Sequence, residues 1–316
     1  MKYTKCDSAD QRAVGTILMN YIFNNKAMNK SVKILEDVSS PCDICLEETC
    51  KGSHNCHCDS CKVQDKCYRK LHATIRITNR CTQECSHCCF MSSPKSNIMM
   101  TVEKAKDIAK FLKNNGVETI NLMGGEFFCN PDWFEIYSEL ISSVKFARLV
   151  TNGDWANNLG VKTKLATLIS LFGNKIYFSI SKDKWHTNKN VEDAKEFLES
   201  AGCRVNVGTE DNTKNESIVP VGRANGKYIG GIYDMFGCYC QNPENMYSFL
   251  IDEKGNIYKC SFGVLCYAHI DEYLEGGFRK KFKEVNSKFY SVFISSCQSC
   301  YNFISLQKPE FIVDCD

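Results

Sequence analysis

Residues 80–88 read Arg-Cys-Thr-Gln-Glu-Cys-Ser-His-Cys and directly follow a strand-like run at 71–78. The spacing C-x3-C-x2-C places Cys81, Cys85 and Cys88 on one loop, where their thiolates can ligate three irons of a [4Fe–4S] cube. Ferredoxin-type sites use four cysteines and close every iron, whereas three cysteines leave one iron open. An open iron can bind a substrate or cofactor, so this loop predicts a site of chemistry.

A second motif supports this interpretation, because Gly124, Gly125 and Glu126 follow the strand-like run at 117–123. The two motifs together resemble the signature of the radical S-adenosylmethionine (radical SAM) superfamily, in which a ring side chain, here His87, precedes the third cysteine. The family often has a proline after the glutamate, and this chain has Phe127 there. Proline fixes only the local backbone, so the difference concerns the course of the loop.

The resemblance implies the cofactors and the reaction. The amino and carboxylate groups of S-adenosylmethionine would bind the open iron, and Gly124, Gly125 and Glu126 would receive the methionyl ammonium. A flavodoxin- or ferredoxin-type donor would reduce the cluster, and cleavage of the sulfonium would release a 5′-deoxyadenosyl radical. That radical would remove a hydrogen atom from the substrate.

Cysteine usage in the whole chain favours metal ligation. The number of cysteines is 21, which is odd, and the chain lacks a signal-peptide pattern, so a disulfide framework is not expected. Zinc is the alternative metal for the loop at 81–88, with Cys89 or His87 as a fourth ligand.

Strand-like runs at 71–78, 117–123, 146–151, 175–181 and 203–209 alternate with helical stretches, and a fainter run lies at 217–221. This alternation predicts an α/β fold built from parallel βα units, and the resemblance implies a partial (β/α)6 barrel. Helix caps are expected at Thr101 and at Asn130. We expect three parts: a Cys-rich extension at 1–70, the radical SAM core at 71–236 and a small domain at 237–316.

In parallel barrels, chemistry collects at the carboxyl ends of the strands. This rule makes Asn152 and Ser179 candidates to contact the cofactor's carboxylate and ribose. Candidates for a general base, and for a thiol that faces the barrel, share a position after a strand; they are Asp183, His186, Glu210, Asp211 and Cys129. A solvated loop charge, or for Cys129 a small core residue, is the alternative for each.

Seven cysteines lie within 237–316, where a hairpin is expected from 247–252 and 257–261. The spacing resembles the one-cluster twitch form of the SPASM extension of radical SAM enzymes. It is preceded by a Gly-Arg-Ala turn at 222–224. The resemblance implies one auxiliary [4Fe–4S] cluster held by Cys240, Cys260, Cys297 and Cys300, with Cys238 as an alternative to Cys240. A four-thiolate zinc site is the alternative.

The N-terminal extension holds eight cysteines. Two C-x2-C pairs and a following cysteine form a candidate metal site made of Cys42, Cys45, Cys58, Cys61 and Cys67. Both a further iron–sulfur cluster and zinc suit this set, because both metals bind thiolates at such spacings.

The formal net charge is only +2, and no block of like charges stands out. Nucleic acid is therefore not an expected partner. No run approaches the roughly 18 apolar residues of a membrane span, and the first ten residues lack a signal-peptide core. We expect a cytoplasmic protein.

Three functions are compatible with these features. The leading hypothesis is oxidative modification of a peptide or protein side chain, as in ribosomal-peptide maturases and sulfatase-maturating enzymes. The second is oxidation of a small-molecule alcohol by a twitch-type dehydrogenase. The third is a Cys-rich zinc protein that binds a partner or nucleic acid, which the content of iron would distinguish.

Overall fold

The computed structural model describes residues 71–183, 185–209, 221–224, 248–259, 262–263 and 265–290. Parallel strands alternate with helices along the first part of this region. The strands are β1 (Leu71–Arg76), β2 (Val117–Met123), β3 (Phe146–Thr151), β4 (Ile176–Lys182) and β5 (Arg204–Thr209). The helices are α3 (Val102–Asn114), α4 (Trp133–Ser142), α5 (Leu159–Phe172) and α6 (Val191–Ser200). The predicted α/β class is confirmed, and these strands begin and end within two residues of the predicted runs.

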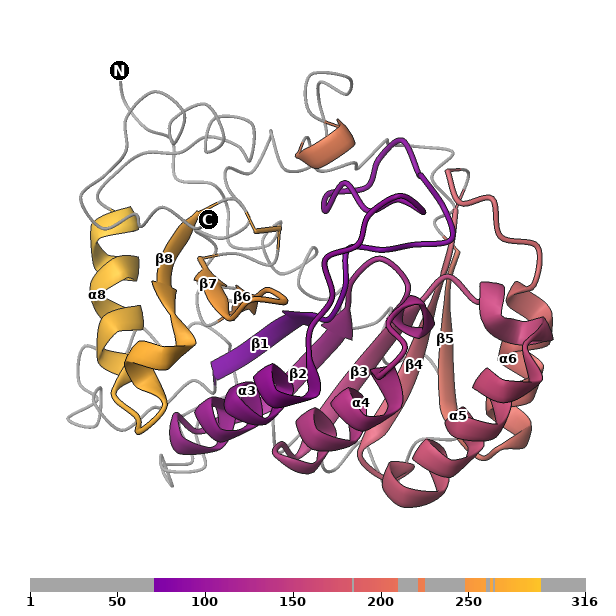
Figure 1. Cartoon of the computed structure of the whole chain (residues 1–316), viewed down its shortest axis with the longest axis horizontal. Helices are drawn as coiled ribbons and strands as arrows, with labels where there is room; N and C mark the ends of the chain where they lie inside the picture. Colours follow the sequence, from indigo (N-terminus) through magenta and orange to yellow (C-terminus); the bar gives the residue numbers. More distant parts are fainter. Residues whose placement is uncertain are drawn as a thin grey trace, which may run out of the picture. The chain divides into compact units, whose positions relative to one another are not determined.

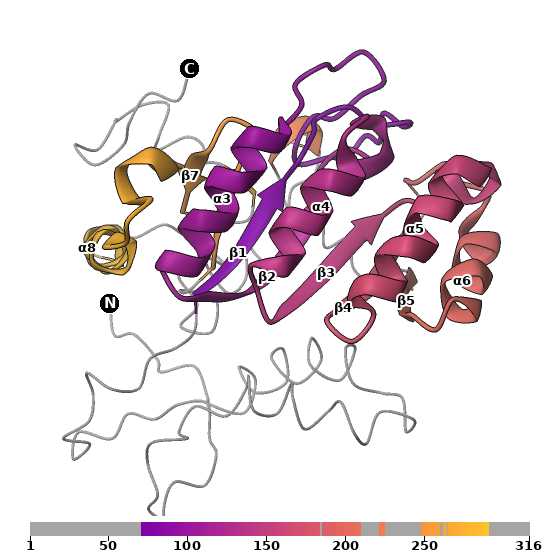
Figure 2. The same ribbon diagram turned by 60° about the horizontal axis from the view of Figure 1, so that its bottom comes forward.

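The helices cover one face of the sheet, as Figure 2 shows for α3 to α6. Each helix buries one stripe of apolar residues; in α3 this stripe is Ala105, Ile108, Phe111 and Leu112. Every second residue of a strand packs against these helices. In β3 these residues include Ala147 and Leu149, which are at most 1% exposed. The main core therefore lies between sheet and helices, and the alternate strand residues face the other side.

Two helix starts test the predicted caps. Thr101 caps α3, because its hydroxyl accepts a hydrogen bond from the Lys104 amide at 3.1 Å. The cap predicted at Asn130 is wrong, since α4 begins at Trp133 after Asp132. The Asn130 amide instead donates to the carbonyls of Ile77 and Met100, so it ties the end of β1 to the start of α3.

The predicted C-terminal hairpin forms and belongs to the same sheet. Its strands are β6 (Ser248–Ile251) and β7 (Asn256–Tyr258), and β8 (Cys266–His269) pairs with β7. The sheet order is β5-β4-β3-β2-β1-β6-β7-β8, with β6 parallel to β1 (Figure 1). Helix α8 (Phe278–Tyr290) packs Phe278 and Phe282 against Phe249 of β6.

Several sequence predictions lie outside the described residues. These are the whole extension at 1–70, most of the faint strand at 217–221 and half of the residues of 237–316. The boundary at 236/237 stays a prediction. Among the helices that the structure describes, none has the length and apolar character needed to cross a membrane.

Candidate functional site

The cysteine loop leaves the carboxyl end of β1 and is held by its own backbone. The Cys81 amide donates to the Ser93 carbonyl at 3.1 Å, and the Cys88 amide donates to the Cys85 carbonyl at 3.2 Å. All three loop cysteines are free thiols, with Cys81 buried and the other two half-buried. Burial raises the pKa of Cys81 to about 12 and that of Cys85 to about 11. Both thiols are therefore protonated at neutral pH until a cation draws out the thiolate.

Arg223 clamps this loop from outside. Its Nε donates to the Cys85 carbonyl at 2.8 Å, its Nη2 donates to the Ser92 carbonyl at 2.6 Å, and its amide donates to the Cys88 carbonyl at 3.1 Å. The neighbouring Gly222 has φ +59°, and a Cβ there would lie 2.3 Å from the Cys89 carbonyl oxygen. The Gly-Arg-Ala turn is thus part of the site. The sequence identified the turn only by resemblance, because nothing local indicates a partner more than 130 residues away.

The Gly-Gly-Glu loop lies directly against the residues that lead into Cys81. The Gly125 amide donates to the Thr78 carbonyl at 2.7 Å, and the Glu126 amide donates to the Arg80 carbonyl at 2.8 Å. A Cβ on Gly125 would lie 1.9 Å from the Arg80 carbonyl oxygen. Glycine is therefore required here by close approach of two backbones.

Glu126 joins the Gly-Gly-Glu loop to the end of β3. Its side chain is fully buried, and its two oxygens accept hydrogen bonds from the Thr151 hydroxyl at 2.7 Å and the Asn152 amide at 2.6 Å. Burial raises the pKa of Glu126 to about 8, although both hydrogen bonds oppose the shift. The Glu126 carboxyl group therefore holds the 151–152 turn in place.

Asn152 completes the connection back to the cysteines. Its Nδ2 lies 2.9 Å from the Thr82 hydroxyl and 3.8 Å from the Cys81 sulfur. The structure thus brings together Cys81, Glu126 and Asn152 from three strand ends. Ser179 lies elsewhere: it is inside β4 rather than at its end, and its hydroxyl accepts a hydrogen bond from Arg148 at 2.9 Å.

Asp183 and His186 follow β4 and lie beside His87 of the cysteine loop. The Nδ1 atom of His186 is 2.8 Å, and the Nε2 atom of His87 is 3.6 Å, from one oxygen of Asp183. Burial opposes ionisation of Asp183, but the bonding and charge of His186 outweigh it and lower the pKa of Asp183. Burial lowers the pKa of His87 as well. Gln83 fixes this loop, since its Oε1 accepts from the Thr187 amide at 3.0 Å.

The remaining predicted residues are placed as follows. Cys129 ends a 3-10 turn, Phe127–Cys129, directly after Glu126, and burial raises its pKa to about 11. Glu210 and Asp211 lie outside the described residues, as do the candidate metal ligands Cys42, Cys45, Cys58, Cys61, Cys67, Cys238, Cys240, Cys260, Cys297 and Cys300.

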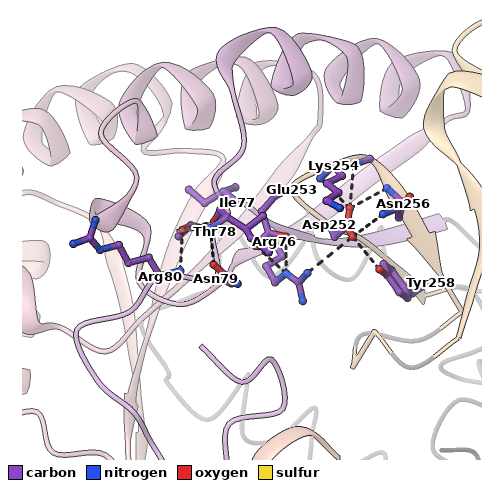
Figure 3. A network of polar contacts seen from close by, with 12 residues as sticks. Arg76, Ile77, Thr78, Asn79, Arg80, Asp252, Glu253, Lys254, Asn256 and Tyr258 are labelled. Atoms are coloured by element: carbon purple, nitrogen blue, oxygen red, sulfur yellow. Dashed lines mark hydrogen bonds and ion pairs between the residues drawn. The ribbon is translucent and has the colours of Figure 1, made fainter. Parts of the chain in front are cut away.

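The hairpin turn meets the other side of the β1 end (Figure 3). Arg76 Nε lies 3.0 and 2.9 Å from the two carboxylate oxygens of Glu253, and its guanidinium also lies over the ring of Phe90. Asp252 organises the turn, because its Oδ1 accepts from the backbone amides of residues 254–256 and its Oδ2 from the Tyr258 hydroxyl. Arg76 thus connects the hairpin to the segment that follows Cys88.

Known proteins match the part of the chain that carries these residues. Residues 75–210 match the model of the Radical SAM superfamily. The chain is 33% identical over 124 residues to the antilisterial bacteriocin subtilosin biosynthesis protein AlbA of Bacillus subtilis (strain 168). These residues are 39% of this chain and 26% of AlbA. The chain is also 33% identical over 116 residues to YydG of the same strain, whose name includes peptide biosynthesis, covering 36% of each chain. The matched segment thus spans about a third or less of these curated relatives.

A solved structure of BtrN in complex with AdoMet and 2-DOIA aligns with 74% of this chain and 92% of that chain, with a TM-score of 0.48 and 13% identity. The parallel sheet and the three-cysteine loop after its first strand define a radical SAM domain. Residues 75–210 form a domain of the radical SAM superfamily.

Proposed function

We propose that this protein binds a [4Fe–4S] cluster through Cys81, Cys85 and Cys88 and uses S-adenosylmethionine to oxidise a side chain of a peptide. One observation carries the proposal. Three motifs from the ends of β1, β2 and β3 meet, because Glu126 hydrogen-bonds the Asn152 amide and the Asn152 side chain reaches the Cys81 sulfur.

The donor set suits a cluster better than a single zinc ion. In the described part of the chain, the His/Cys/Asp/Glu set whose ligand atoms all lie within 4.8 Å of one another is His87, Asp183 and His186. The three loop cysteines form no such tight group, although a zinc knuckle needs its thiolates around one ion. A cube binds each thiolate at a different iron.

When bound, the cluster and S-adenosylmethionine would supply radical chemistry that can take a hydrogen atom from the substrate. The chain's own residues position and shield that chemistry. Gly124 and Gly125 lie close to the cysteine loop, where we assign them to the methionyl end of the cofactor. Glu126 acts through Asn152, which it orients towards Cys81.

Oxidation also requires an acceptor for a proton and one for an electron. We assign the proton to the Asp183–His186 pair, which flanks the cysteine loop at the end of β4. Cys240, Cys260, Cys297 and Cys300 would hold an auxiliary cluster, which would supply an acceptor for the electron. A flavodoxin- or ferredoxin-type protein would reduce the first cluster. The peptide substrate is supported by the names of AlbA and YydG.

The test of the class uses anaerobically purified, iron- and sulfide-reconstituted protein. With dithionite and S-adenosylmethionine it should release 5′-deoxyadenosine, and the Cys81→Ala, Cys85→Ala, Cys88→Ala triple variant should release none. The triple variant should also contain about four irons fewer, since one cube is lost. Zinc without iron in the wild type would refute the proposal.

The test of the oxidation uses the Cys297→Ala, Cys300→Ala double variant together with short peptides encoded beside the gene. The wild type should remove two hydrogens from its peptide, as seen by mass spectrometry. The double variant should still form 5′-deoxyadenosine but no oxidised peptide, because the electron has no acceptor. Equal loss of both products in a folded variant would make the auxiliary site structural. A methylated peptide would show that the protein transfers a methyl group to the peptide instead of oxidising it.

A further inference from the structure

The helix-free face of the sheet carries a half-buried arginine in the middle of β3, Arg148, whose Nε atom is buried. Ala147 and Leu149 point into the core beneath the helices, so Arg148 between them points to the opposite face. Its Nη2 donates to the Ser179 hydroxyl of β4 at 2.9 Å, which places both side chains on that face. Ser179 is only 5% exposed.

The residues beside Arg148 across the sheet offer it no negative charge. The strand registers place Thr74, Asn121, Tyr177 and Arg204 in its row, and none of these is acidic. Burial raises the pKa of Tyr177, so its phenol stays neutral. Burial, and then the charge of Arg148, lower the pKa of His72 on β1 to about 4, so that imidazole is neutral too.

Arg148 itself is incompletely satisfied. Within the described ranges it forms no ion pair, and its Nε is buried without an acceptor. Arg76, at the end of β1, shows the contrast, because Glu253 neutralises it. A buried donor of a charged group without an acceptor is costly, and a guanidinium presents its donors as a fork that fits a carboxylate.

We infer that Arg148, together with Ser179, binds a carboxylate of the peptide substrate, from an acidic side chain or the C-terminus. This inference rests on the proposed function. Arg148 precedes Asn152 by four residues, which is about 13 Å along a strand. Since Asn152 is the residue that reaches the Cys81 sulfur, the carboxylate would bind deeper in the barrel than the reacting group. The site would fix which substrate residue reaches the cluster.

Saturation-transfer NMR on the reconstituted protein tests the inference without turnover. The probes are Ac-Ala-Glu-Ala-NH2 and Ac-Ala-Gln-Ala-NH2, which differ in one carboxylate, and Ac-Ala-Gln-Ala-OH, which restores it at the C-terminus. The wild type should give saturation transfer to the two carboxylates and little to the neutral peptide. Arg148→Met should abolish the difference, and Ser179→Ala should reduce it. Lys145→Met, which removes a surface charge next to β3, should leave it unchanged.

A second arm identifies the source of the carboxylate. The dissociation constants of S-adenosylmethionine and of its decarboxylated analogue should be the same in the wild type and in Arg148→Met. A loss of about tenfold for S-adenosylmethionine alone would assign Arg148 to the cofactor and overturn the inference. Equal binding of the acidic and neutral peptides by the wild type would also overturn it. If the wild type still releases 5′-deoxyadenosine in that case, the proposed function survives.

Discussion

Arg76 and Glu253 form an ion pair across 177 positions of the chain, at the point where β1 and β6 end side by side (Figure 3). The Glu253 side chain is 1% exposed and that of Arg76 is 18% exposed. Burial raises the pKa of Glu253, and the charge of Arg76 opposes this shift. The charge of Arg76 therefore favours the ionised form of a carboxyl group that burial disfavours.

Arg76→Met should destabilise the protein by about 3–5 kcal/mol, because it leaves Glu253 buried without a cation. The double variant Arg76→Met, Glu253→Gln should recover part of this loss, as denaturation of the reconstituted protein would measure. Lys110→Met is the control, since it breaks an exposed pair with Glu275 and should change stability by less than about 1 kcal/mol. If the changes in the free energy of unfolding caused by Arg76→Met alone and by Glu253→Gln alone simply add up in the double variant, Arg76 and Glu253 do not act as a pair.

Gly125→Ala should disrupt the site because its Cβ would lie 1.9 Å from the Arg80 carbonyl oxygen. We expect loss of S-adenosylmethionine binding, measured by calorimetry, and weaker retention of iron. Gly160→Ala is the control, since its Cβ would lie 3.4 Å from its nearest neighbour at the start of α5. That control should be neutral or stabilise by up to about 1 kcal/mol. Unchanged cofactor binding by Gly125→Ala would contradict the close approach.

Arg223→Met should loosen the cysteine loop by removing the bonds to the Cys85 and Ser92 carbonyls. Iron should then be lost to a chelator about tenfold faster than from the wild type, as two charge-assisted hydrogen bonds disappear. Arg223→Lys should restore little, because an ammonium cannot reproduce the fork. If both variants lose iron to the chelator at the rate of the wild type, the side chain of Arg223 does not stabilise the cysteine loop.

Glu126 should make stability depend on pH. Its folded pKa, about 8, lies above the ordinary value of 4.5, so the folded state keeps a proton that the unfolded chain has released. The free energy of unfolding should therefore fall as the pH rises from 4.5 to about 8. Denaturation at pH 5.5 and 8.5 should show a smaller difference in Glu126→Gln than in the wild type. Glu135→Gln, on the exposed face of α4, should behave like the wild type.

The sequence was sufficient for the parts of the site that lie next to strand ends. The cysteine loop, Gly124 to Glu126 and Asn152 follow runs whose alternation marks them as strands, and parallel strands bring their carboxyl ends together. The same rule predicts Asp183 and His186 as candidates, and the structure places both after β4. Their contact with His87 was not predicted, because the conformation of two loops decides it.

Contacts between distant segments escaped prediction for a physical reason. Arg76, Arg148 and Arg223 each sit in local sequence typical of a strand or turn, and their partners depend on register or chain path. Asn130 shows the opposite error. Its local sequence is typical of a helix cap, yet its Oδ1 accepts from the Asp132 amide before the helix begins, and its Nδ2 donates to two buried carbonyls of other segments.

The position of β6 beside β1 constrains how the protein is made. Strand β1 carries the cysteine loop and lies between β2 and β6, so one of its two edges is completed by residues 248–251. Pairing over such a separation requires closure of a long loop and raises the contact order of this part of the sheet. During synthesis, β1 would expose an open edge until the hairpin emerges from the ribosome. Insertion of a cluster at Cys81 is therefore expected to follow translation of the hairpin.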